Sequence, residues 1–185
     1  MRLLALRLPA LAFPLLLASA LSGCGGGGVG GMIDSIAKGG GGSNLPGDGA
    51  GVGAMSPTEQ ADADAVLALV NGERTKAGLN ALLPDSSAAT AAYDHAVDMD
   101  VRQYFDHNSP EGTTPGQRMA AAGCVFHGWG ENIAMGQPTP VDVMTAWMGS
   151  PGHRANILSP SFTHLGVGCR YGTGTVYWVQ DFLSR

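Results

Sequence analysis

Apolar residues at helical spacing follow a polar start signal in the segment that begins at Ser56. The residues Ser56-Pro57-Thr58-Glu59 combine a serine N-cap, a proline at the first helical position and a glutamate at N3, which is the pattern of a capping box. An apolar stripe at Val66, Leu67 and Val70 comes next, and Gly78 marks the end. The pattern therefore predicts a first helix that begins after Ser56 and ends near Gly78.

A second helix is predicted after Pro84-Asp85-Ser86. Its apolar face consists of small residues and a methionine: Ala89, Ala92, Ala96 and Met99. The opposite side is charged, which is typical of a helix that faces solvent on one side: Asp94, Asp98 and Arg102. His95 lies beside these charged residues in the sequence, and we expect it to be solvated.

Two shorter helices and a terminal hairpin complete the pattern. Thr113 or Thr114 caps a helix with Pro115 in its first turn, and Pro138-Thr139-Pro140 precedes another. Four runs are strand-like: Cys124 to Phe126, Ile133-Ala134, Leu165 to Tyr171 and Thr175 to Phe182. Gly172-Thr173-Gly174 is typical of a tight hairpin connection between the last two. Because helices come first and an antiparallel hairpin last, we expect an α+β sandwich rather than a doubly wound parallel sheet.

The composition limits the classes of function. The chain has 185 residues, of which 44% are hydrophobic and 14% charged, and its formal net charge is -5. The apolar share excludes a wholly disordered chain. The negative net charge argues against nucleic acid as a partner, because phosphates attract basic surfaces.

Residues 1–23 have the pattern of an export signal. Arg2 and Arg7 are their only charges, and an apolar stretch runs from Leu8 to Leu21. This stretch is short for a membrane span, which needs about 20 residues. Its end, Leu21-Ser22-Gly23-Cys24, resembles the lipobox of bacterial lipoproteins, which implies cleavage before Cys24 and diacylation of the Cys24 thiol. The alternative is a non-lipidated secretory signal with a chance cysteine.

Residues 24–55 are predicted to form a flexible tether that starts at the acylated cysteine. Between Gly25 and Met55 there are 14 glycines in 31 residues, so the segment cannot bury enough surface to offset the entropy of ordering it. A folded domain of residues 56–185 is expected to follow. The lipid would hold this domain in the cell envelope, at the outer membrane or periplasmic face of a Gram-negative cell and at the cell surface otherwise.

Two further cysteines lie in the predicted domain. With Cys24 acylated, Cys124 and Cys169 remain as a pair in an oxidising compartment. We expect them to form a disulfide, which would stabilise the domain by about 4 kcal/mol through closure of a long loop. The alternative is a pair of buried free thiols.

Three polar residues are candidates for a functional site. Glu131 follows Gly128-Trp129-Gly130 in an apolar neighbourhood, where glutamate is rarely buried unless it is paired or bound to a metal. His107 follows the turn at Tyr104-Phe105-Asp106, and His164 precedes a predicted strand. Each of the three also has an ordinary alternative as a solvated or loop-lining residue.

Four segments occur in an informative order. They are Phe105-Asp106-His107, Gly130-Glu131-Asn132-Ile133, Trp147 to Leu158 and Phe162 to Gly168. Together they resemble the CAP superfamily, which unites cysteine-rich secretory proteins, antigen 5 and plant pathogenesis-related proteins, and in particular its bacterial SCP-like extracellular branch. The resemblance implies a three-layer α-β-α sandwich with a central antiparallel sheet and a cleft.

The resemblance also implies which residues line the cleft. The cleft of the family carries two histidines and two acidic residues, and His107, His164 and Glu131 match three of these positions. The second acid belongs at the position of Ser150, so the set is incomplete. His153, in the same loop, is a candidate for a partial replacement or for a residue that caps a short helix. Two neutral imidazoles and one carboxylate can provide three ligands of an open zinc site, so His107, His164 and Glu131 are candidate Zn²⁺ ligands.

The resemblance to the family supports a binding role more readily than any particular reaction. We expect a lipid-anchored binding or interaction module of the cell envelope, whose cleft holds a small lipid, a sterol or an envelope component. The alternative is a metal-assisted hydrolase that uses Glu131 as base and the histidines as ligands, and a structural envelope protein without a ligand is the third reading. Neither a Gly-x-Ser-x-Gly nor a His-Glu-x-x-His motif occurs, so no catalytic residue is assigned.

Overall fold

The computed structural model of the protein describes residues 53–185. The predicted signal peptide, the acylated Cys24 and most of the predicted tether lie outside the described residues. No helix within the described range is long and apolar enough to cross a membrane.

The four predicted helices are present, and a fifth follows the fourth directly. Their bounds are α1 Pro57–Lys76, α2 Ser86–Arg102, α3 Pro115–Ala121, α4 Pro140–Gly149 and α5 Pro151–Ile157. The predicted capping box at the start of α1 forms, since the side chains of Ser56 and Glu59 each accept a hydrogen bond from the other's backbone N–H. Thr114 and Thr139 cap α3 and α4 in the same local way. Pro151 begins α5 as a separate helix.

Four strands form one sheet in the order β1-β3-β4-β2. Their bounds are β1 Leu83–Pro84, β2 Gly128–Met135, β3 His164–Tyr171 and β4 Val176–Ser184. β4 is antiparallel to both β3 and β2, which confirms the terminal hairpin. The expected central antiparallel sheet is present in β2, β4 and β3, and the short β1 adds a parallel pairing to β3.

The strand expected at Cys124 to Phe126 is also absent. The backbone N–H of Cys124 donates to the carbonyl of Met119 at 2.9 Å, which closes the end of α3 instead. Val125 is exposed. The β2 strand begins only at Gly128.

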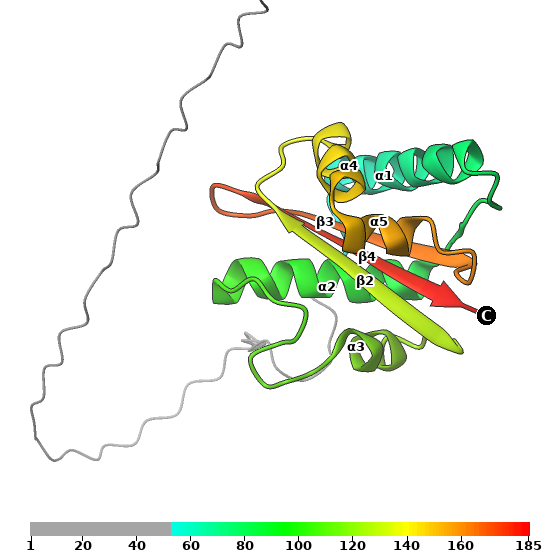
Figure 1. Ribbon diagram of the computed structural model, residues 1–185. Helices are drawn as coiled ribbons and strands as arrows, with labels where there is room; N and C mark the ends of the chain where they lie inside the picture. The colour runs from blue at the N-terminus through cyan, green and yellow to red at the C-terminus, as the bar shows by residue number, and fades with distance from the viewer. Residues whose placement is uncertain (1–52) are drawn as a thin grey trace, which may run out of the picture. The chain divides into compact units, whose positions relative to one another are not determined.

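The sheet lies between two layers of helices (Figure 1). The core on one face joins the sheet to α1, α4 and α5, and the cores on the other face join it to α2 and α3. This arrangement confirms the predicted α+β three-layer sandwich.

Helix α2 packs directly on β3 because glycine and alanine meet there. A Cβ atom on Gly166 would lie 2.2 Å from the backbone carbonyl carbon of Ala88, and one on Gly168 would lie 2.4 Å from the backbone nitrogen of Tyr93. Both distances are far below van der Waals contact, so a larger residue on β3 would displace the helix. Small residues of α2 therefore determine how close it comes to the sheet; Ala92 at this contact was predicted on the apolar face, whereas Ala88 was not.

The predicted disulfide between Cys124 and Cys169 was wrong, because both residues are buried free thiols. Cys169 belongs to the core that packs under α1 and α4. Cys124 packs with Met119 and Leu183 on the opposite face of the sheet. The sheet therefore separates the two sulfur atoms. Burial raises the pKa of the Cys124 thiol to about 11 and raises that of Cys169 as well.

Candidate functional site

Strand β2 points one charged side chain into the α2/α3 face of the sheet. Residues of a strand alternate between its two faces, so Trp129, Glu131 and Ile133 share one face. The Glu131 side chain is only 1% exposed. Directly opposite it in the sheet register lies Asp181 of β4.

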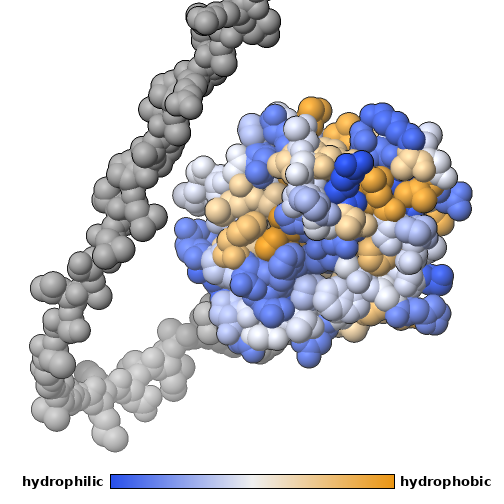
Figure 2. Space-filling view, in the orientation of Figure 1, coloured by the Kyte–Doolittle hydropathy of each residue, from blue (hydrophilic) through white to orange (hydrophobic). Residues whose placement is uncertain are grey.

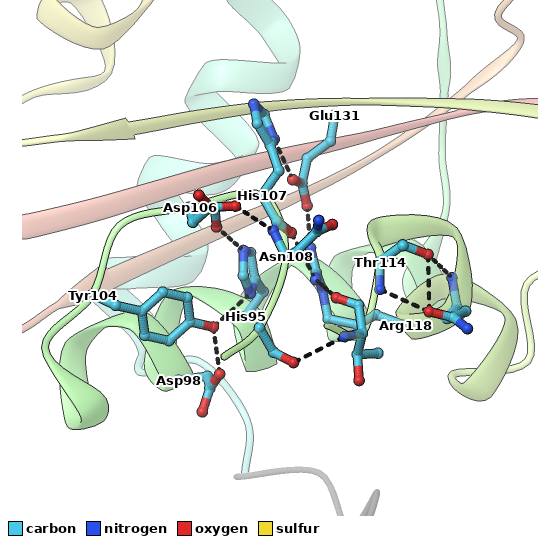
Figure 3. A network of polar contacts seen from close by, with 12 residues as sticks. His95, Asp98, Tyr104, Asp106, His107, Asn108, Thr114, Arg118 and Glu131 are labelled. Carbon is cyan, nitrogen blue, oxygen red and sulfur yellow. Dashed lines mark hydrogen bonds and ion pairs between the residues drawn. The ribbon is translucent and has the colours of Figure 1, made fainter. Parts of the chain in front are cut away.

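Two basic side chains bind the two oxygens of Glu131. Nδ1 of His107, in the loop between α2 and α3, lies 2.6 Å from Oε1, and Nη2 of Arg118 from α3 donates to Oε2 at 2.6 Å. Nη1 of Arg118 also donates to the carbonyls of His107 and Thr113, at 2.9 and 3.1 Å. Figure 3 shows these contacts converging on the His107 loop. Arg118 therefore fixes both the carboxylate and the backbone that carries the imidazole.

His107 presents one ring nitrogen to the outside. Its side chain is 50% exposed, and because Nδ1 is engaged by Glu131, Nε2 is the nitrogen that remains for a ligand. The hydrogen bond to Glu131 raises the pKa of His107, although partial burial of the ring opposes this shift. The imidazole thus stays protonated to a higher pH than a free histidine.

His95 holds the same loop through a contact with its backbone. The expectation that His95 is solvated was wrong. Its side chain is buried in α2, with Nε2 3.0 Å from the carbonyl of Asp106, the residue before His107. Tyr104 connects His95 to Asp98, since its hydroxyl contacts Nδ1 of the imidazole and donates to the carboxylate. Burial lowers the pKa of His95 to about 4, so the ring is neutral at physiological pH. The sequence did contain the signal, because His95 lies at helical spacing between the apolar residues of α2.

His164 does not join Glu131 and His107 in a metal site. It begins β3 opposite Leu183, and β4 lies between it and β2, which separates the backbones of β2 and β3 by about 10 Å. Nδ1 of His164 lies 2.8 Å from Oγ1 of the neighbouring Thr163. Among residues 53–185, no three His, Cys, Asp or Glu side chains are grouped so that they could hold a metal ion. The described residues therefore do not form the three-ligand zinc site expected from the sequence.

His153 approaches the site from the other side of β2. Asn132 donates to the backbone carbonyl of His153 at 3.1 Å, and Asn156 donates to Oδ1 of Asn132 at 2.9 Å. These bonds hold α5 against the edge of β2. Burial lowers the pKa of His153, and the positive charge of a protonated His107 lowers it further. Ser150 is the residue between α4 and α5, and its side chain makes no capping hydrogen bond.

The site therefore combines a partly exposed imidazole with a fully enclosed carboxylate. In its protonated form, Nε2–H of His107 can donate to a ligand oxygen, and in its neutral form Nε2 can accept a proton. His107 and Glu131 were predicted as site residues, whereas Arg118 and Asp181 were not. An arginine in a short helix gives no sign in the sequence that it meets a glutamate from a distant strand.

Family comparisons agree with the four segments and with the fold. The model of the CAP family, the cysteine-rich secretory protein family, matches residues 67–182. The chain is 44% identical over 120 residues to the uncharacterized protein YkwD and 34% identical over 120 residues to the uncharacterized membrane protein YlbC, both of Bacillus subtilis. These matches cover 65% of this chain but only 46% and 34% of the two relatives. The chain thus spans less than half the length of either.

Solved structures show the same architecture. An extracellular protein of Bacillus anthracis that contains a SCP domain matches with a TM-score of 0.66 and 32% identity, over 72% of this chain and 45% of the other. An outer surface protein of Borrelia burgdorferi matches with a TM-score of 0.64 and 24% identity, over 68% of this chain and 94% of the other; at this identity the likeness shows the fold alone. Because the family model matches more than half of the chain, the chain belongs to the CAP family of cysteine-rich secretory proteins.

Proposed function

We propose that this chain is an exported, lipid-anchored CAP protein of the cell envelope and that it binds a ligand around His107, Glu131 and His153, where the family resemblance implies a cleft. The signal-like residues 1–23 and the lipobox-like Leu21-Ser22-Gly23-Cys24 support export and anchoring. So does the similarity to an extracellular protein of Bacillus anthracis and to a membrane protein of Bacillus subtilis. The observation that carries the binding role is the buried Glu131 beneath a half-exposed His107.

A purely structural role does not account for this arrangement. Buried ion pairs contribute little stability beyond what apolar packing would give, because both charges must be desolvated. Here Glu131 and Arg118 are enclosed, with side-chain exposures of 1% and 12%, while the imidazole that they position remains open to solvent. Charged networks that shift the pKa of an accessible side chain are characteristic of functional sites.

The chemistry of the cleft favours a ligand with acceptor oxygens. A protonated His107 donates from Nε2, and anionic or carbonyl oxygens of envelope lipids and other envelope components provide such acceptors. Exposed aromatic side chains accompany the polar groups, since Phe105 precedes His107 by two residues and Trp129 shares a face of β2 with Glu131. An amphiphilic ligand could place its acceptor group at His107 and its apolar part against the exposed aromatic side chains.

The binding role is tested by NMR on the histidine rings of the purified chain. Vesicles of anionic phospholipid and soluble envelope fragments are added in separate titrations, and Zn²⁺ in a third. Binding at the cleft shifts the ring resonances of His107 and leaves those of the exposed His127 unchanged. His107→Ala should weaken binding at least tenfold, whereas the control His127→Ala should not. If none of the three titrations shifts the ring resonances of His107, the proposed binding site is wrong.

The anchor is tested separately. Cys24→Ala should release the protein from membranes or leave the precursor uncleaved, because the thiol that carries the lipid is lost. The mass of the mature chain checks the same point. An unmodified Cys24 in mature protein would contradict the lipid anchor without affecting the cleft.

One observation favours hydrolysis as a second candidate function. With Nδ1 bound to Glu131, His107 has the orientation of a general base whose free Nε2 can take a proton from water. A hydrolase of this kind should lose turnover in His107→Gln while it still binds its substrate. A wild type that binds the substrate without turning it over would favour the binding role alone.

A further inference from the structure

Asp181 is a completely buried carboxyl group beside Glu131. The two residues are register partners on β4 and β2, so both side chains lie on the α2/α3 face of the sheet. Asp181 is 0% exposed. Neither of its carboxyl oxygens receives a hydrogen bond from an N–H or O–H donor of the described residues. An ionised aspartate in such a place would be unusual, since buried charges are normally paired.

The elements around Asp181 supply no free cation. On β3 its register partner is Gly166, which has no side chain, and the backbone of Ala88 in α2 closes over that glycine. The charged and titratable groups that act on Asp181 are Glu131 from β2 and Arg118 from α3. The Cys124 thiol, which follows α3, also lies within range of its charge.

Arg118 makes no hydrogen bond to Asp181, although its charge opposes part of the rise in the pKa of Asp181. Nη1 binds the carbonyls of His107 and Thr113, and Nη2 binds Glu131. Nε is buried and makes no hydrogen bond. His95, the titratable residue of α2 that faces this cluster, is neutral and bound to the carbonyl of Asp106. Glu131 thus takes the cationic partners, and Asp181 is left with a negatively charged neighbour.

A proton on Asp181 resolves this conflict. Burial and then the charge of Glu131 raise the pKa of Asp181 well above its ordinary value. A neutral carboxyl group has one O–H donor, and the Glu131 carboxylate is the acceptor beside it.

We propose that Asp181 is a positioning residue of the site, which carries a proton at neutral pH and donates it in a hydrogen bond to Glu131. Glu131 then has three donors, from His107, Arg118 and Asp181, and the carboxyl pair carries a single negative charge. This gives the site a second acid from β4, although Ser150 occupies the position at which the family's second acid was expected. The inference rests on the buried pair and does not require the proposed ligand.

The proton is tested by infrared spectroscopy of the full chain at pH 7. The wild type should show the C=O stretching band of a neutral carboxyl group, and Asp181→Asn should remove it. Asp100→Asn is the matched control, because Asp100 is also a buried acid but is paired with Arg170 at 3.1 Å. The control variant should keep the band. Absence of the band in the wild type, or its persistence in Asp181→Asn, overturns the proposal.

Two further measurements keep the proposal testable if Asp181→Asn folds poorly. The ¹³C resonance of the Asp181 carboxyl in the wild type should keep the chemical shift of a protonated carboxyl group from about pH 4 to pH 7, whereas an ionised Asp181 would have the chemical shift of a carboxylate. If Asp181→Asn folds, its stability relative to that of the wild type should increase as pH rises above about 4. The reason is that the unfolded aspartate ionises there while the native one keeps its proton. A constant difference across this range would contradict the proposal.

Discussion

The two faces of strands β2 and β4 carry the same kind of polar pair with opposite character. On one face Glu131 lies beside Asp181, and on the other Asn132 lies beside Gln180. The amides bind each other at 3.0 Å and hold α5 through uncharged hydrogen bonds. Of the two carboxyl groups, that of Glu131 instead binds an arginine and a histidine. Neighbouring residues on the same strands thus provide a structural clamp on one side and a charged site on the other.

One face of the sheet therefore contributes mainly to the stability of the fold, and the other carries the candidate site. The face under α1, α4 and α5 has the larger apolar core, including the completely buried Trp147 and Trp178. A buried cation secures that layer, because Arg74 donates to the carbonyls of Ile157 and Ser159 at 2.8 Å. Figure 2 shows that on the face viewed there the exposed apolar residues form small clusters among hydrophilic ones. On the other face, burial of the charges of Glu131 and Arg118 opposes folding because both must be desolvated. In return, these residues hold His107 in place.

The largest effect on stability is expected on the apolar face. Trp147→Ala should lower the free energy of unfolding by about 4 kcal/mol, because it leaves a large cavity and removes the indole N–H bond to the carbonyl of Ile133. Trp147→Phe keeps most of the apolar volume, so it should lower the free energy of unfolding clearly less than Trp147→Ala does. Denaturant unfolding measures both variants. Equal losses would mean that the hydrogen bond, rather than packing, dominates on this face.

A smaller loss is expected on the charged face. Glu131→Gln should lower the free energy of unfolding by about 2–3 kcal/mol, because the enclosed Arg118 loses its carboxylate partner. The same variant should lower the pKa of His107, which ring NMR can follow. The control Glu111→Gln affects a solvent-exposed partner of Arg102 and should change stability little. A Glu131→Gln variant as stable as the wild type would contradict the idea of a coupled buried network.

The pH dependence of stability should distinguish the faces further. Because the folded pKa of His107 lies above its unfolded value of about 6.5, its contribution is fully present below that value and is lost as pH rises through the folded pKa. The stability difference between the wild type and His107→Gln should therefore shrink from mildly acidic to alkaline pH. His127→Gln, at an exposed histidine, is the control. A difference that is independent of pH would show that the ring is not coupled to Glu131.

Local signals in the sequence predicted the frame of the fold but only part of the site. Ser56, Asp85 and Thr139 cap the helices that follow them because a cap depends on a few adjacent residues. The four segments of the family pattern gave His107 and Glu131. His164 was assigned to the same group by resemblance, yet the order of the strands keeps it on β3, two strands from Glu131.

The missed residues depend on contacts between distant parts of the chain. Asp181 follows Gln180 in a largely apolar strand, and only the register of β4 with β2 places it beside Glu131. Arg118 reaches Glu131 because α3 packs over β2. Propensity and spacing describe one segment at a time, so neither could show that these three side chains share a buried volume.

The smallest effect is expected from reducing agents, and it tests the position of the two cysteines. Since Cys169 lies in the core under α1 and α4 and Cys124 on the opposite face, dithiothreitol should leave the midpoint of thermal unfolding unchanged. Alkylation of the unfolded chain without prior reduction, followed by peptide mass analysis, should find both Cys124 and Cys169 modified. A peptide pair joined through these two residues would instead require the sheet to open, because the sulfur atoms of a disulfide must lie about 2 Å apart. Such a bond would mean that Cys124 and Cys169 do not lie on opposite faces of the sheet.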